Sequence, residues 1–389
     1  MDKEKLPVVS AIALNAIFGY EPKFSHNIID ALGSAEAVFS LPQDEILRIF
    51  GPYSKYSARI CRDSLDAAER EHDRLREGGY QFLSIFDEGY PSALRDCPDA
   101  PIVLYVRSAT PAGELFNRVP AVSIVGTRDI SPYGREWCRK TVGAIADAPS
   151  RPMIVSGMAL GVDITAHLAA LDEGLPTIGV SPVGIEDVYP RRHMAYAERM
   201  VNTPGCALVT DYPPGTGASA VNFLRRNRII AGISSSTILI ESRIRGGGMM
   251  TARLAYDYGR EVFALPGRID DARSQGCNHL LREKVAEPIS DLAGLPSALG
   301  LGTYNLRKYE GVEQMVRGHL GSECGEDELE KLVKLALTIK KNRGIDIDGI
   351  CRECGLGYSE AANLTGMLEN EGLIEMDLLQ RCTINLKKA

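Results

Sequence analysis

The sequence has no run of apolar residues near 18 in length. It also has no secretory signal, since Met1-Asp-Lys-Glu-Lys-Leu-Pro is charged and no cleavage pattern follows it. We therefore expect no membrane association and a cytoplasmic location. The nine cysteines are scattered and odd in number, which favours reduced thiols over a disulfide framework. A lone Cys351-x-x-Cys354 in an apparent helix is typical of helix packing.

The chain also lacks a net positive charge, since its formal charge is -7. This argues against a protein that binds polyanions over a broad surface. No lysine occurs between residues 141 and 283, where 14 arginines face 14 acids. Within Val221 to Arg245, however, five arginines accompany a single acid, Glu241. Focal charge carried by arginine alone favours a pocket that holds a few phosphates.

The length of 389 residues is too great for one ordinary core, and a hydrophobic content of 44% with 24% charged residues is typical of a globular protein. The N-terminal part reads as short helices separated by Gly and Pro. The expected helices span 8–18, 27–32, 35–39, 43–50 and 56–76. A segment around Tyr90-Pro91 and 99–105 then looks like an extended lead-in to the next part.

From Val119 to Gly267 the pattern alternates between apolar strands and helices, which predicts an α/β fold with a mostly parallel sheet. The expected strands span 119–125, 153–156, 177–180, 207–211, 237–241 and 261–265. Ligands of such sheets bind at the carboxyl ends of the strands. The unusual residues of this chain fall at those ends, which predicts a site there.

The most informative segment is Phe223-Leu-Arg-Arg-Asn-Arg-Ile-Ile-Ala-Gly-Ile-Ser234. It places Arg225, Arg226 and Arg228 at the start of a helix whose later positions are apolar. Arginine forks can bind phosphates, and the ring of Phe223 offers a face for a nucleobase. These residues predict a binding site for an anionic ligand.

Two further strand ends carry candidate site residues. Gly126-Thr-Arg128 would let the backbone approach a ligand and would point an arginine into the same crevice. Ser156 and Gly157, with Gly161, place a hydroxyl and free N–H groups at a helix start, where anions bind. A strand-end salt bridge and an ordinary helix cap are the structural alternatives. Asp163 and His167 are expected to be a capping carboxylate and a packed histidine, with no metal site.

Signatures of catalysis are absent or incomplete. No Lys-Ser/Thr follows Gly246-Gly-Gly248, so it is not a P-loop, and Ser156 lacks the G-x-S-x-G setting of a nucleophile. Gly215-Thr-Gly-Ala-Ser-Ala220 matches a dinucleotide fingerprint, with Glu241 at the usual distance. Pro213-Pro214 would break the tight turn that this fingerprint needs. The dinucleotide alternative stays open at this point.

The C-terminal sequence predicts a helix-turn-helix with a trailing wing. An acidic stretch from Glu323 to Glu330 opens one helix, and residues 345–374 supply two more. The last of these carries Glu360, Asn363, Glu369 and Glu371 without Arg or Lys. That charge favours protein contact over reading of a DNA groove.

Several motifs, in order, resemble the DNA-processing protein A (DprA/Smf) family. They are Ser123-Ile-Val-Gly-Thr-Arg128, Ser156-Gly-Met-Ala-Leu-Gly-Val-Asp-Ile-Thr-Ala-His167, Tyr189-Pro190, the segment from Phe223 to Ser234, and Val262-Phe-Ala-Leu-Pro-Gly267. The resemblance implies a Rossmann-like core that binds single-stranded DNA, forms a homodimer and helps to load the RecA recombinase in natural transformation. It also implies four ranges: an N-terminal helical (SAM-like) domain (1–78), the core (79–293), a linker (294–324) and a winged helix (325–389).

The resemblance implies a DNA-binding set taken over from the family motifs or from their immediate surroundings. That set is Gly126, Arg128, Ser156, Gly157, Gly161, Arg191, Arg192, Phe223, Arg225, Arg226, Asn227 and Arg228. Arg191 and Arg192 stand where the family often has a lysine. Leu224 departs from the family pattern, which has proline after the phenylalanine. We expect no cofactor, no metal and no catalytic residue, and we expect reversal of Arg128 or Arg228 to glutamate to abolish DNA binding without unfolding the protein.

Two other functions compete with this prediction. One is a nucleotide-processing enzyme on the same fold, of the lysine-decarboxylase-like phosphoribohydrolase type. Those enzymes carry P-G-G-x-G-T-x-x-E, and the segment from Gly246 to Arg253 has the glycines without the carboxylate. The other is an adaptor whose winged helix binds a partner while the core serves as a scaffold.

Overall fold

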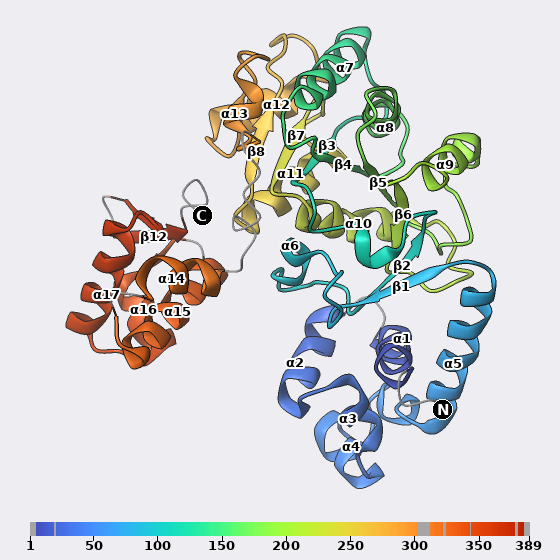
Figure 1. Cartoon of the computed structure of the whole chain (residues 1–389), viewed down its shortest axis with the longest axis vertical. Coiled ribbons are helices and arrows are strands. Elements are labelled where there is room, and N and C mark those ends of the chain that lie inside the picture. The colour runs from blue at the N-terminus through green and yellow to red at the C-terminus, as the bar shows by residue number, and fades with distance from the viewer. Residues whose placement is uncertain are drawn as a thin grey trace.

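The computed structural model describes residues 5–18, 21–301, 312–321, 324–342, 344–377 and 380–384. Along the chain, a group of helices is followed by an α/β part with a large sheet and then by a small part of helices with a short sheet (Figure 1). In the described ranges no helix is both long and apolar enough to cross a bilayer. The α/β fold class is as predicted.

Three of the N-terminal helices begin and end close to the predicted positions. The helix predicted for 27–32 begins earlier, at Pro22, and the one predicted for 56–76 is a 3-10 turn followed by a helix that begins at Arg62. The N-terminal elements are α1 (Leu6–Phe18), α2 (Pro22–Leu32), α3 (Ala35–Ser40), α4 (Gln43–Phe50), the 3-10 turn η1 (Ser57–Arg59) and α5 (Arg62–Glu77). Local signals explain some of these boundaries. Gly33 ends α2 in a left-handed conformation, with φ of 86°, and the Ser34 side chain accepts a hydrogen bond of 3.2 Å from the backbone N–H of Ala37 at the start of α3.

The central sheet has nine strands in the order β1-β2-β6-β5-β4-β3-β7-β8-β9. The strands are β1 (Gln81–Ser84), β2 (Val103–Arg107), β3 (Ala121–Val125), β4 (Met153–Ser156), β5 (Thr177–Val180), β6 (Ala207–Thr210), β7 (Ser236–Leu239), β8 (Glu261–Ala264) and β9 (Glu287–Pro288). From β6 to β9 all neighbours are parallel. The six predicted strands are β3 to β8.

Two strands that the sequence pattern did not predict come before β3: β2 overlaps the end of the extended lead-in, and β1 precedes the lead-in. β2 pairs antiparallel with β6, and β1 pairs antiparallel with β2. Residues 103–106 are fully buried, so β2 lacks the alternation that marks a half-exposed strand. Its pairing is set by contact with β6, a hundred residues later, which is not visible locally.

Helices cover both faces of the sheet. On one face lie α7 (Pro132–Ala146) and α8 (Val162–Asp172), with α9 (Met194–Val201) beyond them; α10 (Ala220–Ile233) and α11 (Gly247–Asp257) cover the other (Figure 1). Shorter helices are α6 (Ser92–Arg95), η2 (Ala112–Glu114), η3 (Arg191–His193), α12 (Gln275–Arg282) and α13 (Leu295–Ala298). The chain leaves β4–β6 on one side of β3 and returns on the other side at β7, after α10. The sheet therefore reverses its order at β3, where ligands bind in such folds.

Both edges of the sheet are closed to further strands. At one edge β9 is two residues long and contains Pro288, which has no N–H to donate. At the other edge the η2 turn packs against β1, and the backbone N–H of Ala112 donates to Oε1 of Gln81 at 2.7 Å. Each edge thus carries one of the devices by which proteins prevent pairing with another chain.

The C-terminal part has its own hydrophobic core, which draws only on residues from 312 onward. Its elements are α14 (Val312–Leu320), α15 (Glu326–Lys341), β10 (Ile345–Asp346), α16 (Ile347–Cys354), α17 (Tyr358–Asn370), β11 (Ile374–Met376) and β12 (Arg381–Ile384), with sheet order β10-β12-β11. This order is the one a winged helix requires, and that assignment stays a prediction. Helix α14 lies in the range expected as a linker, yet it packs against α15. Residues 302–311, Ser322 and Glu323 of that range lie outside the described residues.

Candidate nucleic-acid interface

An arginine and two aromatic rings meet at the carboxyl edge of the sheet. Arg128 follows β3, is exposed, and places its guanidinium 4.6 Å from the ring centre of Phe223 on α10. The ring of Phe223 in turn meets that of Tyr189 edge-on, with centres 5.2 Å apart. Tyr189 is 40% exposed and Phe223 is partly exposed, so the pair is accessible to a ligand. A cation over an exposed aromatic pair suits a nucleobase and its phosphate.

Two more arginines follow Tyr189 directly. Arg191 and Arg192 form the 3-10 turn η3 and are both exposed. The next residue, His193, is buried, and its Nδ1 donates to the carbonyl of Met158 at 2.9 Å. This bond fixes η3 to the loop that follows β4. The two arginines are therefore held at the same edge of the sheet as Arg128.

The three predicted glycines contact the chain itself at very short range. A side chain at Gly161, whose φ is 77°, would lie 2.2 Å from the carbonyl oxygen of Thr127. At Gly126 it would lie 2.6 Å from Cγ2 of Val162, and at Gly157 it would lie 2.1 Å from Nη1 of Arg226. Only glycine permits these approaches. The close approach that was predicted for a ligand is made by the chain itself: by the loop after β3, by the start of α8 and by Arg226 on α10.

The predicted anion-binding helix start is occupied by the chain's own carboxylate. Asp163 is buried and accepts a hydrogen bond of 3.3 Å from the backbone N–H of Ala159. Burial raises the pKa of Asp163, and the nearby Arg226 opposes that shift. The Ser156 hydroxyl is buried and donates to the carbonyl of Ile124 at 2.6 Å. The prediction that the Ser156 hydroxyl contacts DNA is therefore corrected. The hydroxyl has a structural role, because its hydrogen bond is made inside the fold.

His167 is a packed histidine, as predicted. It is fully buried, and its Nδ1 lies 2.7 Å from Oγ1 of Thr177. That hydroxyl already donates to the carbonyl of Ile154, so Nδ1 must be the donor to it. Burial lowers the pKa of His167 to about 3, and the imidazole is neutral at physiological pH.

Arg226 is buried beneath the loop that follows β4. Its side chain is 3% exposed, and Nη1 donates to the carbonyl of Val180 at 2.5 Å. Burial lowers its pKa to about 10, with Asp163 opposing the shift, so the guanidinium stays charged near neutral pH. Arg226 adds positive potential from below the surface rather than an open fork. Asn227 is also buried.

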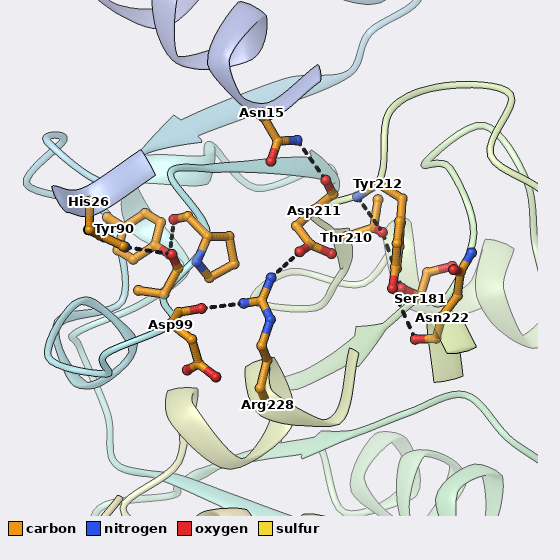
Figure 2. A network of polar contacts seen from close by, with 12 residues as sticks. Asn15, His26, Tyr90, Asp99, Ser181, Thr210, Asp211, Tyr212, Asn222 and Arg228 are labelled. Atoms are coloured by element: carbon orange, nitrogen blue, oxygen red, sulfur yellow. Dashed lines mark hydrogen bonds and ion pairs between the residues drawn. The ribbon is translucent and has the colours of Figure 1, made fainter. Parts of the chain in front are cut away.

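Arg228 belongs to a buried network that joins four segments (Figure 2). Its guanidinium forms an ion pair with Asp211, at the end of β6, and donates to the carbonyl of Asp99 at 2.7 Å. The carbonyl of Asp211 accepts a bond of 2.8 Å from Asn15 of α1. Figure 2 shows Arg228 extended between Asp99 and Asp211. This corrects the prediction that Arg228 contacts a phosphate of the DNA. The reason is that the Arg228 side chain is buried and that acceptors from two distant segments hold both of its terminal nitrogens inside the fold.

Arg225 faces a different side of α10. Successive helical residues are rotated by 100°, so a residue two positions after Phe223 points nearly opposite to it. Arg225 lines a pocket of about 520 Å³ between α2, α10 and α11, together with Phe24, Leu224 and Met250. The structure therefore brings Arg128, Arg191, Arg192 and Phe223 to one edge and leaves Arg225 elsewhere. Tyr189, which the sequence analysis did not select, belongs with the first group; its only local signal was the Tyr-Pro pair.

The geometry disfavours the dinucleotide alternative. Nine residues, 211–219, separate the end of β6 at Thr210 from the start of α10, whose cap is the Ser219 side chain. A dinucleotide fingerprint starts its helix within the glycine motif itself. Glu241, the expected ribose carboxylate, is buried and accepts bonds from the Ser131 N–H at 2.9 Å and the Ser131 hydroxyl at 2.5 Å. It therefore stabilises the start of α7. In the described ranges no cluster of three or more possible metal ligands occurs.

Comparison with known proteins agrees with this arrangement. Residues 81–299 match the family model described as DNA recombination-mediator protein A. The chain is 36% identical over 202 residues to DNA processing protein DprA of Streptococcus pneumoniae, covering 52% of this chain and 68% of that protein. It is 31% identical over 338 residues to a putative DNA processing protein DprA of Mycobacterium tuberculosis, covering 81% and 80%.

Solved structures give the same result. The crystal structure of DprA from Streptococcus pneumoniae aligns with a TM-score of 0.60 and 27% identity, over 77% of this chain and 96% of that one. A structure that concerns the single-stranded DNA binding mode of DNA processing protein A from Helicobacter pylori aligns with a TM-score of 0.50 and 30% identity, over 57% and 95%. The chain therefore belongs to the DNA recombination-mediator protein A family, which includes proteins named DprA and Smf.

Proposed function

We propose that this protein binds single-stranded DNA at the carboxyl edge of its sheet. The observation that carries the proposal is the exposed Arg128 guanidinium stacked on Phe223 beside Tyr189. In the described ranges Arg128 has no ion-pair partner, so its charge is available to a phosphate. The neighbouring Arg191 and Arg192 supply further positive charge. The other members of the predicted set that belong to these segments are buried or partly buried in the fold: Gly126, Ser156, Gly157, Gly161, Arg226, Asn227 and Arg228.

The chemistry of the surface favours single strands over duplex DNA. A base stacks on the Tyr189–Phe223 pair only when it is turned out of a helix, and every base has a face for such stacking. Arginines at the same edge bind the flanking phosphates as forks. Focal positive charge lets a chain with a formal charge of -7 hold a polyanion at one edge.

We also propose a role for this binding. The family is named for recombination mediation, and this supports the inference that the protein protects incoming single strands and loads the RecA recombinase in natural transformation. A homodimer would join two binding edges and raise the avidity for one strand. The proposed mode of action needs no catalytic step by the protein.

The test is fluorescence anisotropy of labelled oligothymidylate across a salt series, with duplex DNA and free nucleotides as competitors. Arg128→Glu should weaken single-strand binding by on the order of a hundredfold at low salt, since a phosphate contact is replaced by repulsion. The matched control is Arg118→Glu, which reverses an exposed arginine that pairs with Glu114 before β3. The control should bind normally, and both variants should unfold at the wild-type temperature.

Two results would contradict the proposal. If the Arg128→Glu variant and the control bound single strands with equal affinity, the carboxyl edge of the sheet would not be the DNA-binding site. Turnover of a mononucleotide without any DNA binding would favour the phosphoribohydrolase-type enzyme instead.

A further inference from the structure

A positively charged hollow is lined by residues of α7, η3, α8 and its preceding loop, and α9. Helices α7, α8 and α9 lie on one face of the sheet (Figure 1). The hollow has a volume of about 330 Å³. Three arginines line it: Arg135 and Arg139 from α7, and Arg192 from η3. We call this hollow the α7–α9 groove. No carboxylate is among its lining residues.

The three arginines are not used by the fold. Each is exposed, and none takes part in an ion pair or side-chain hydrogen bond within the described residues. Arg135 and Arg139 are four positions apart on α7 and so lie on one helical face. Two neighbouring guanidinium groups repel each other in the absence of an anion, and a phosphate between them removes that repulsion.

The floor of the groove suits a nucleobase rather than a bare ion. Leu160, Ile164 and Leu168 supply apolar side chains, and Tyr196 is 39% exposed at the rim. Apolar contact below with cationic forks above is the arrangement that binds a nucleotide by its base and its phosphates.

The α7–α9 groove and the proposed site share Arg192 and adjoin at Gly161. Gly161 lines the groove and also packs against the backbone of Thr127 and Arg128. A side-chain carbon added at Gly161 would lie 2.8 Å from the carbonyl oxygen of Arg128. Arg192 lines the groove and directly follows Arg191. The groove therefore lies beside the proposed site, with Arg191 and Arg192 between the two.

We propose that the α7–α9 groove binds a further nucleotide of the same DNA strand, through its phosphates at Arg135, Arg139 and Arg192 and its base over the apolar floor. The inference rests on the proposed function and extends it. It assigns Arg135 and Arg139 a binding role that lengthens the stretch of strand in contact with one protein molecule.

The test compares two strand lengths on the full-length protein. The double variant Arg135→Glu/Arg139→Glu is measured with a short oligothymidylate of about 6 nucleotides and with one several times longer. We expect a loss of about tenfold or more for the long strand and little change for the short one. The slope of log affinity against log salt for the long strand should fall by about 1.4, because roughly 0.7 is lost per phosphate contact on single strands.

The matched control, Arg62→Glu/Arg118→Glu, makes the same change of charge at exposed arginines of α5 and of the segment before β3. If the groove variant binds the long strand as the control does, the inference is wrong. It is also wrong if the groove variant changes only the binding of free thymidine monophosphate or inorganic phosphate, since the groove would then be a small-anion site. Failure of the proposed function looks different: the wild-type protein would bind neither strand length.

Discussion

At the residue scale, three arginines of one short segment have three different roles. Arg225 faces the pocket beside α2, Arg226 lies buried under the loop after β4, and Arg228 pairs with Asp211. The sequence shows that arginines are concentrated between Val221 and Arg245. It could not predict which guanidinium reaches solvent, because the acceptors that bury Arg228 lie 17 and 129 positions away in the chain.

The role of Arg228 leads to a prediction about stability. Arg228→Ala leaves Asp211 buried without its cation and should lower the free energy of unfolding by about 3–5 kcal/mol. Chemical denaturation followed by circular dichroism measures this loss. Arg128→Ala serves as the control and should unfold like the wild type, since that side chain is exposed. Wild-type stability of the Arg228→Ala variant would contradict the assignment and restore Arg228 as a candidate for direct DNA contact.

At the scale of elements, the strands were the most predictable feature. β3 to β8 are short apolar runs separated by helical patterns, and their predicted ends differ from the observed ends by at most two residues. The antiparallel strands β1 and β2 were missed because β2 joins the sheet through β6, which comes a hundred residues later, and β1 joins it only through β2. Glycines were correctly predicted to permit close approach, but the approaching group is the chain itself.

The packing of the loops after β3 and β4 can be tested with a pair of glycines. Gly161→Ala places a carbon 2.2 Å from the Thr127 carbonyl at a φ of 77°, so we expect a loss of about 1–3 kcal/mol of stability and weaker DNA binding as Arg128 shifts. Gly217→Ala is the matched control, because nothing lies within 4 Å of the added carbon and its φ is not positive. Thermal unfolding measures the stability of both variants, and fluorescence anisotropy measures their affinity for single-stranded DNA. Identical behaviour of the two would contradict the proposed packing role.

At the scale of the whole molecule, the described parts differ in how they share a core. Residues of α1 and α2, including Leu14 and Ile28, belong to the same hydrophobic cluster as Leu104 and Val209 of the sheet. The cluster of the C-terminal part contains no residue before 312. A described contact between that part and the rest is the ion pair of Lys340 with Asp96, and surface pairs of this kind contribute about 1 kcal/mol or less.

This difference predicts the effect of truncation. A chain ending at residue 301 should fold and bind single-stranded DNA with an affinity close to that of the full chain, because the Arg128–Phe223 surface draws nothing from the C-terminal part. The measurement is anisotropy on purified truncated protein, with circular dichroism to verify folding. A folded truncated protein that no longer binds DNA would show that the C-terminal part contributes directly to the interface.

The closed edges of the sheet constrain how copies of this protein can associate. Backbone pairing across β9 is blocked by its length and by Pro288, and the far edge is flanked by η2. The proposed homodimer would therefore be held by side chains of helices and loops rather than by a continuous sheet. Single substitutions change such side-chain contacts, whereas backbone pairing tolerates most substitutions. Sequence changes could then tune the proposed self-association while the proposed DNA-binding edge is left unchanged.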